Sequence, residues 1–242
     1  MLDADSLIPK AAMYLRLILI PSLITLAVTI LRLIGELRHW SGKWFSSDTG
    51  GTTPYGVAWV VGITWLAALF GAYFAVQLTR AQRKPSSLVK ATIFSALGIF
   101  IFLSYRYVVE YLAVSLNLRF PHYLIFIWLL WGLAGGLQYF AWPELFKTLL
   151  LYAYAARIPV AIIMFFAMLG HWGTHYDYVG MRIPLWGLPR FLWLAFFPQL
   201  AGWISFTVTL GSAAGVVVLL LKKLIGLPSR NNLDRIDLGA VN

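Results

Sequence analysis

The sequence predicts an all-α, polytopic integral membrane protein, built as a bundle of six transmembrane helices. Of its 242 residues, 60% are hydrophobic and only 12% are charged, whereas soluble domains hold about 45–50% apolar and about 25% charged residues. The mean hydropathy is +0.78. A soluble fold of this length could not bury so much apolar surface, so we expect the chain to lie in a bilayer.

The apolar residues form six continuous runs, each close to the ~20 residues that an α-helix needs to cross a bilayer. Because these runs do not alternate with polar residues, they predict helices rather than the strands of a membrane barrel. The predicted spans cover residues 11–36, 55–79, 89–116, 121–141, 145–170 and 190–221. They belong to a single transmembrane domain, residues 1–225, followed by a polar tail, residues 226–242, that we expect to be mobile.

The chain lacks cysteine, which excludes disulfides, thiol nucleophiles, cysteine-ligated zinc and iron–sulfur clusters. Its acidic start carries Asp3 and Asp5, and no small-residue cleavage site follows the first apolar run. We therefore expect the first run to be retained as a helix rather than removed as a signal peptide.

The net charge of +10 reflects Lys and Arg residues gathered at the ends of the apolar runs. One set of ends holds eleven of them: Lys10, Arg16, Arg80, Arg83, Lys84, Lys90, Lys147, Lys222, Lys223, Arg230 and Arg235. The other set holds six: Arg32, Arg38, Lys43, Arg119, Arg182 and Arg190. This asymmetry predicts a multi-pass protein of the inner, cytoplasmic-type membrane with both termini in the cytoplasm. The expected partners are the bilayer and its anionic lipid head groups, and not nucleic acid.

The six spans fall into two kinds. In the even-numbered spans, residues 49–79, 120–143 and 191–221 contain no Asp, Glu, Lys or Arg. Each of these spans also carries a small-x-x-x-small pair of the kind that lets helix backbones approach closely. These pairs are Ala67/Gly71, Gly132/Gly136 and Gly211/Gly215. The odd-numbered spans are interrupted by charges, which usually face other helices or a cavity. We therefore expect the odd spans to supply a polar interior and the even spans to shield it.

Two of the odd spans share an Arg-x-x-x-Glu spacing, Arg32 with Glu36 and Arg106 with Glu110. Residues four apart lie on one face of a helix, so each arginine can pair with its own glutamate. Such pairs act either as locally neutralised charges near the outer boundary or as part of a ligand-binding or transport path.

Arg157 is the most deeply placed charge, ten residues beyond Lys147 and therefore about 15 Å into the bilayer. Insertion of an arginine at that depth costs about 2.5 kcal/mol or more, so a partner is expected. Pro159, Pro198 and Gln199 fall at a similar depth. Arg157 either satisfies the carbonyls that the prolines leave free, or it provides a fixed positive charge for an anionic ligand or transport path.

All four histidines are predicted at the outer face: His39, His122, His171 and His175. The last two belong to an H-x-x-x-H-x-D stretch that ends at Asp177. Imidazoles four residues apart with a carboxylate can ligate zinc, with His39 or His122 completing the set and Glu36 as a general base. The alternative is that neutral histidines form hydrogen bonds in an aromatic loop at the membrane interface.

In the fifth span, Phe146 and Lys147 are followed by a small-residue helix with Tyr152 and Ala153 and then by Pro159. Over about residues 139–170, this stretch resembles bacterial Yip1-domain membrane proteins. The resemblance implies a polytopic membrane protein without catalytic residues that organises or contacts other membrane components.

Three function classes follow from these observations. The first is a non-enzymatic membrane protein that acts as a scaffold or as a subunit of a larger complex, with no cofactor. The second is a small transporter or channel with its polar site at Arg157. The third is a zinc-dependent membrane hydrolase that uses the outer histidines.

Overall fold

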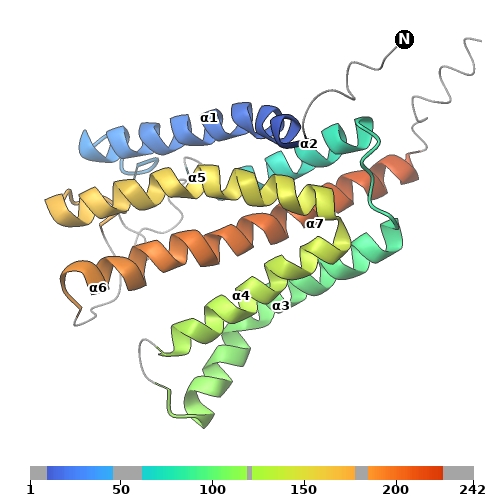
Figure 1. Ribbon diagram of the computed structural model, residues 1–242. Helices are drawn as coiled ribbons and strands as arrows, with labels where there is room; N and C mark the ends of the chain where they lie inside the picture. The colour runs from blue at the N-terminus through green and yellow to red at the C-terminus, as the bar shows by residue number, and fades with distance from the viewer. Residues whose placement is uncertain (1–9, 46–61, 119–121, 178–184, 226–242) are drawn as a thin grey trace, which may run out of the picture.

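The computed structural model describes residues 10–45, 62–118, 122–177 and 185–225, and every regular element within these ranges is a helix (Figure 1). The long helices are α1 (Lys10–Leu37), α3 (Leu88–Ser115), α4 (His122–Ala141), α5 (Pro143–Gly170) and α7 (Trp203–Leu224). The shorter ones are α2 (Leu66–Arg80) and α6 (Gly187–Phe191), and two π-helical stretches, η3 (Leu192–Phe196) and η4 (Pro198–Gly202), join α6 to α7.

Five helical segments among the described residues are long and apolar enough to cross a membrane. The predicted all-α membrane bundle is therefore confirmed, and the bounds of these five spans agree with prediction to within three residues at either end. The exception is the predicted span 55–79, where the described helix, α2, has 15 residues. The first part of that span and the predicted mobile tail, 226–242, lie outside the described residues.

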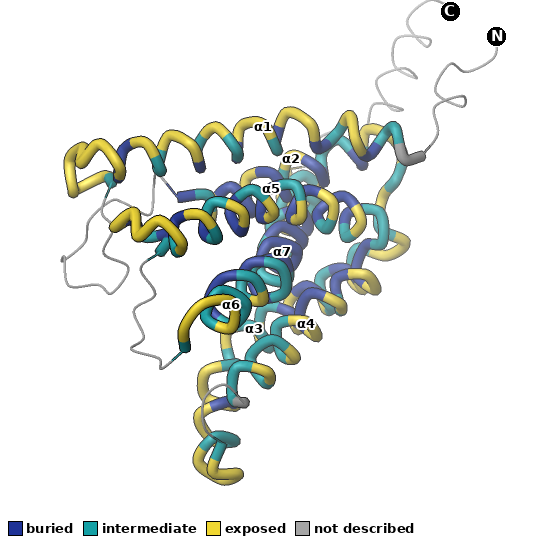
Figure 2. The backbone as a smooth tube through the Cα atoms, turned by 60° about the vertical axis from the view of Figure 1, so that its left-hand side comes forward, coloured by how far each residue is buried: buried dark blue, intermediate teal, exposed yellow. Residues whose placement is uncertain are grey.

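The centre of the bundle is formed by α5 and α7. Both helices carry long buried faces, whereas α3 lies at the periphery with few buried residues (Figure 2). α3 corresponds to the third predicted span and α7 to the sixth. The prediction that the odd-numbered spans form the interior and the even-numbered spans shield it is therefore wrong for these two helices. The reason is that small residues on α7 allow it to approach its neighbours closely, and helix association in a membrane depends on such close packing.

The contact between α2 and α7 shows this close approach. A methyl group placed on Gly71 would lie 2.2 Å from the carbonyl oxygen of Gly211, and one placed on Gly215 would lie 2.9 Å from the Cβ of Ala75. Two of the three predicted small-residue pairs thus lie at a helix–helix contact. The third pair, Gly132 and Gly136 on α4, faces open space within the described part of the chain.

The α3–α4 hairpin is held together by a polar contact in its interior. The Ser95 hydroxyl donates to Oε1 of Gln138 over 3.0 Å, and Nε2 of Gln138 donates to the carbonyl of Ala134 over 3.0 Å. Away from this contact, the hairpin diverges from the rest of the bundle toward the loop between α3 and α4 (Figure 1). One end of the hairpin is therefore packed on α7 and the other stands apart.

The two ends of the bundle differ in composition. We call the end at which α1 and α5 finish, near His39 and His171, the histidine end. The opposite end carries Arg83, Lys147 and Lys222, and we call it the basic end.

At the basic end, Glu144 gathers three partners. The Tyr14 hydroxyl donates to it, Arg83 donates to Oε2 through Nη1 over 3.0 Å, and Nζ of Lys147 lies 3.6 Å from Oε1. The indole of Trp142 also donates to the carbonyl of Arg83 over 2.9 Å. These contacts join α1, α5 and the segment that follows α2.

Candidate functional site

A cavity of about 210 Å³ lies within the half of the bundle nearer the histidine end. Most of its lining comes from α1, α5 and the η4–α7 segment, with contributions from the turn after α5 and the segment before α2. The lining residues are Thr29, Arg32, Gly62, Ile63, Thr64, Arg157, Val160, Met164, His175, Tyr176, Gln199 and Trp203. Three of them, Arg32, Arg157 and Gln199, were predicted as members of a ligand or transport path.

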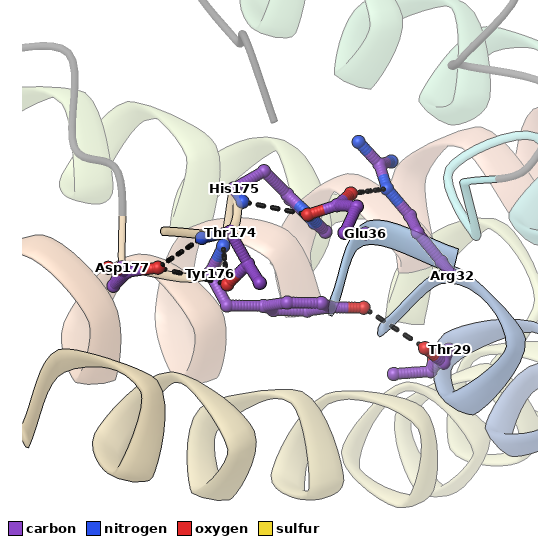
Figure 3. Close-up of polar contacts among 7 residues, drawn as sticks. All are labelled: Thr29, Arg32, Glu36, Thr174, His175, Tyr176 and Asp177. Carbon is purple, nitrogen blue, oxygen red and sulfur yellow. Dashed lines mark hydrogen bonds and ion pairs between the residues drawn. The ribbon is translucent and has the colours of Figure 1, made fainter. Parts of the chain in front are cut away.

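Glu36 contacts two of the residues that line this cavity, Arg32 and His175 (Figure 3). Its side chain is only 1% exposed, and its Oε1 accepts from Nε of Arg32 over 2.9 Å. The backbone N–H of His175 donates to the other carboxylate oxygen over 2.8 Å, and Nδ1 of His175 lies 2.6 Å from Oε1. The ring nitrogen and the carboxylate oxygen are thus in close contact without a well-aligned hydrogen bond. The predicted pairing of Arg32 with Glu36 is therefore present, and it extends to a histidine 139 residues away.

The turn that presents His175 is fixed by Asp177. Its Oδ2 accepts from the backbone N–H of Gly173 over 3.0 Å, and its Oδ1 accepts from the backbone N–H and the hydroxyl of Thr174 over 2.7 and 2.9 Å. The Tyr176 hydroxyl then donates to the carbonyl of Thr29 in α1 over 3.2 Å (Figure 3). The turn is thus tied to α1 at two points, His175 and Tyr176.

Burial sets the charge state of this turn, which lies outside the long apolar helices. Removal from water lowers the pKa of His175 below its usual 6.5, and the nearby Glu36 carboxylate opposes that effect without cancelling it. Burial also raises the pKa of Tyr176 well above 10. At neutral pH both side chains are therefore uncharged, and the imidazole adds no positive charge to the cavity.

Arg157 is the deepest charged residue of the cavity and is 5% exposed. Its Nη1 donates to Oε1 of Gln199 over 3.4 Å, a long contact, and its guanidinium carbon lies 4.7 Å from the ring centroid of Trp203. Its Nε has no hydrogen-bond partner among the described residues. Nε2 of Gln199 is directed to the sulfur of Met164 at 3.4 Å. Arg157 thus has polar and aromatic neighbours, but the contact with Gln199 is weak.

The charges around the cavity do not balance. Among the described residues, Arg157 makes no ion pair, and the carboxylate bonded to lining residues is Glu36, which is already shared by Arg32 and His175. With His175 neutral, two guanidinium groups face one carboxylate. The net charge is therefore positive, in an environment where an isolated charge is costly. An anion is the ligand type that such a cavity would stabilise.

The second predicted Arg-x-x-x-Glu pair behaves differently. Arg106 and Glu110 are both exposed on α3, and no ion pair joins them in the described part of the chain. They lie on the peripheral helix and not at the cavity. The same Arg-x-x-x-Glu spacing therefore corresponds to a buried ion pair at Arg32 and Glu36 and to two exposed side chains at Arg106 and Glu110.

Of the five residues predicted as zinc ligands, the four whose side chains are described, His39, His171, His175 and Asp177, are not brought together. His39 and His171 are exposed, Asp177 binds its own turn, and His175 contacts Glu36. His122 begins α4, and its side chain lies outside the described residues. Within residues 10–45, 62–118, 122–177 and 185–225 there is no group of three or more His, Asp and Glu side chains arranged to hold a metal. Glu36, predicted as a general base, instead holds Arg32 and His175.

Several lining residues were not predicted as members of the site, among them Thr29, Tyr176 and Trp203. Trp203 stands four residues after Gln199, so a helix places both side chains on one face, and that spacing was a signal available in the sequence. The contact between Tyr176 and Thr29 joins residues 147 positions apart, and no spacing in the sequence indicates it.

Comparisons with protein-family models, with curated proteins and with solved structures found no match. The arrangement of charges and cavities in this chain is therefore the basis for the functional conclusions that follow.

Proposed function

We propose that this membrane protein binds a small anion in the cavity beside Arg157 and carries it across the membrane. The observation that carries the proposal is the buried guanidinium of Arg157, which has one long hydrogen bond and no described ion-pair partner. A bound carboxylate, phosphate or similar anion would supply both the missing charge and the missing acceptor for Nε. Charge-assisted contacts of this kind are among the strongest that arginine makes.

The helices around the cavity support a transport role. The last span is π-helical from Leu192 to Phe196 and from Pro198 to Gly202, a stretch that includes Gln199. The helix is continuous through this stretch, and π-helical turns within α-helices often occur at functional sites. The predicted polar level at Arg157, Pro159, Pro198 and Gln199 coincides with this segment.

The other half of the bundle supports a carrier rather than an open channel. Beyond Arg157 toward the basic end, α5 presents Leu145, Leu149 and Tyr152 to an apolar cluster that also contains Phe70 and Phe74. These side chains fill the space between α2, α5 and α7. Passage of an anion would therefore require a change of conformation rather than diffusion along a continuous polar path.

Uptake into proteoliposomes tests the proposal. Purified protein is reconstituted, and uptake of radiolabelled formate, acetate, nitrate and inorganic phosphate is measured against protein-free vesicles. We expect saturable uptake of at least one anion, lost in Arg157→Gln and retained in Lys147→Gln, which changes an exposed cation on the same helix. Uptake that is equal in Arg157→Gln and the unmodified protein, or absent for all four anions, would contradict the proposal.

We propose the predicted orientation, with both termini in the cytoplasm, for the same protein. It is supported by the eleven Lys and Arg residues at one set of ends against six at the other. Because the chain has no cysteine, single-cysteine labelling gives a direct test. An impermeant thiol reagent applied to intact cells should modify Trp40→Cys and not Lys84→Cys, and the reverse pattern would invert the topology.

A second candidate function, as a subunit or scaffold of a larger membrane complex, is favoured by one feature of α4. Gly132 and Gly136 face open space within the described part of the chain, although the other two small-residue pairs are packed. Exposed Leu129 and Leu133 lie on the same face, so another transmembrane helix could approach closely there. The resemblance of the fifth span to Yip1-domain proteins would agree with such an organising role.

Native mass spectrometry in a mild detergent tests this second function. We expect a homo-oligomer or a stoichiometric subunit to be lost in Gly136→Leu. The matched control is Ala96→Leu, which places the same side chain on a small residue at an exposed position of α3. A monomer in the unmodified protein, or equal loss in both variants, would remove this candidate.

A further inference from the structure

A second cavity, of about 460 Å³, lies at the basic end between α1 and α2. It forms because α1 packs mainly on α5 and makes few contacts with α2. Its lining residues are Met13, Arg16, Leu17, Tyr73, Gln77, Leu78, Ala81 and Arg83. We call it the α1–α2 cleft. It shares no residue with the cavity beside Arg157.

The polar rim of the cleft carries two guanidinium groups. Arg16 is exposed on α1, and no described carboxylate pairs with it. Arg83 follows α2 and is fixed in place, since its Nη1 binds Glu144 over 3.0 Å and its carbonyl accepts from Trp142 over 2.9 Å. That ion pair engages one terminal nitrogen of Arg83, and a guanidinium offers five N–H donors. The rim therefore combines Arg16, which no described carboxylate pairs with, and Arg83, which Glu144 and Trp142 fix in position.

The rest of the cleft is apolar or weakly polar. Met13 and Leu17 of α1 pack against the main apolar cluster, to which the buried Leu78 of α2 belongs. The exposed Tyr73 and the half-buried Gln77 stand one turn apart on α2 and also line the cleft. A ligand that matches the cleft thus has an anionic head that meets two arginines and an apolar part that lies between two membrane helices.

We infer that the α1–α2 cleft is a binding site for the headgroup of an anionic phospholipid. Arginine binds phosphate oxygens through paired N–H donors, which favours a phosphate head over a simple point charge. The acyl chains would then follow the apolar surface between α1 and α2, which faces the lipid. Basic residues at the membrane surface attract anionic lipids generally, but the cleft adds a fixed position and an apolar floor to that attraction.

Native mass spectrometry of the purified full chain tests this inference. The protein is supplied with equal amounts of phosphatidylglycerol and phosphatidylcholine of different masses. We expect one phosphatidylglycerol to be retained in preference, and Arg16→Gln to reduce its occupancy about fivefold, the effect of one basic residue near an anionic surface. Arg80→Gln is the matched control, because Arg80 is exposed at the end of α2 but does not line the cleft. It should leave the occupancy unchanged.

Three results would overturn the inference. Equal loss of lipid in Arg16→Gln and Arg80→Gln would show general surface attraction without a site. Equal retention of phosphatidylglycerol and phosphatidylcholine would show that the cleft does not distinguish an anionic headgroup from a neutral one. Displacement of phosphatidylglycerol by millimolar inorganic phosphate would identify a site for a free anion rather than a lipid. Because Arg16 is exposed, Arg16→Gln is expected to fold normally, and an unchanged thermal midpoint checks this.

Discussion

Glu36 and Glu144 are two carboxylates with similar partners and different surroundings. Each accepts from an arginine over about 3 Å, at 2.9 Å for Arg32 and 3.0 Å for Arg83. Each also joins α1 to another part of the bundle, Glu36 from α1 to the turn after α5 and Glu144 from α5 to Tyr14 of α1. The Glu36 side chain is 1% exposed, whereas that of Glu144 is 29% exposed.

This difference in exposure indicates that the contacts of Glu36 belong to a ligand site, whereas those of Glu144 only hold helices together. At the basic end, Arg83, Lys147 and Glu144 are all partly exposed, so water can solvate the positive charge that Glu144 does not neutralise and the contact needs no ligand. At the histidine end, Glu36 is buried and its carboxylate is shared by Arg32 and His175, which leaves the buried Arg157 without a described counter-charge. The buried network is therefore the one whose charge a bound anion would complete.

The largest expected effect comes from Glu36→Gln. This change keeps the size of the side chain but leaves the Arg32 guanidinium without its counter-charge in a largely buried position. Removal of one partner of a buried ion pair typically costs about 3 kcal/mol or more. We therefore expect the free energy of unfolding to fall by about 3 kcal/mol, measured by thermal or denaturant unfolding in detergent. Glu110→Gln, at an exposed position of α3, is the control and should change little.

The matching change at the basic end, Glu144→Gln, should cost about 1 kcal/mol or less, since exposed ion pairs contribute little and water can solvate Arg83 and Lys147. The same unfolding measurement compares it with Glu36→Gln. If the two variants lost equal stability, the contrast between a buried and a solvated network would be wrong.

A smaller effect is expected from pH. Burial lowers the pKa of His175 in the folded protein, whereas an unfolded histidine keeps a pKa of about 6.5. As the pH falls below about 6.5, the unfolded chain takes up a proton that the folded chain does not, so stability decreases until the lower folded pKa is reached. Thermal midpoints between about pH 7.5 and about pH 5.5 should fall in the unmodified protein and fall less in His175→Asn. His39→Asn, at an exposed histidine, should follow the unmodified protein.

The fold was predictable where the physical signal is local. Continuous apolar runs of sufficient length predict α1, α3, α4, α5 and the last span, because a helix in a bilayer must satisfy its own backbone. Which helices lie at the centre was not predictable from charge. The close approach of Gly71 to Gly211 places α7 inside, and the same type of pair on α4 stays unpacked within the described residues, so the motif alone does not specify its partner.

The site was predictable in parts. The spacing of Arg32 and Glu36 predicts their ion pair, which the structure contains. Arg157 and Gln199 were predicted at a similar depth, and the structure joins them by a long hydrogen bond. The sequence also places Glu36 and His175 at one end, but as parts of a zinc site. The carboxylate instead contacts His175 directly. Burial decides between these roles, and burial depends on tertiary packing that the spacing does not encode.

The central claim is that the buried charge of Arg157 is there to bind an anion, and ligand-dependent stability tests it most directly. The thermal midpoint of the purified protein is measured with formate, acetate, nitrate and phosphate at constant ionic strength, for the unmodified chain and for Arg157→Met. An anion at about 100 times its dissociation constant stabilises a folded protein by about 2.7 kcal/mol.

We expect at least one anion to raise the midpoint of the unmodified protein. Arg157→Met, which replaces an unpaired buried charge with an apolar side chain of similar length, should be at least as stable without ligand and should not respond to that anion. An equal response in both proteins, or a large loss of stability in Arg157→Met without any anion response in the unmodified chain, would contradict the account and make Arg157 a structural residue.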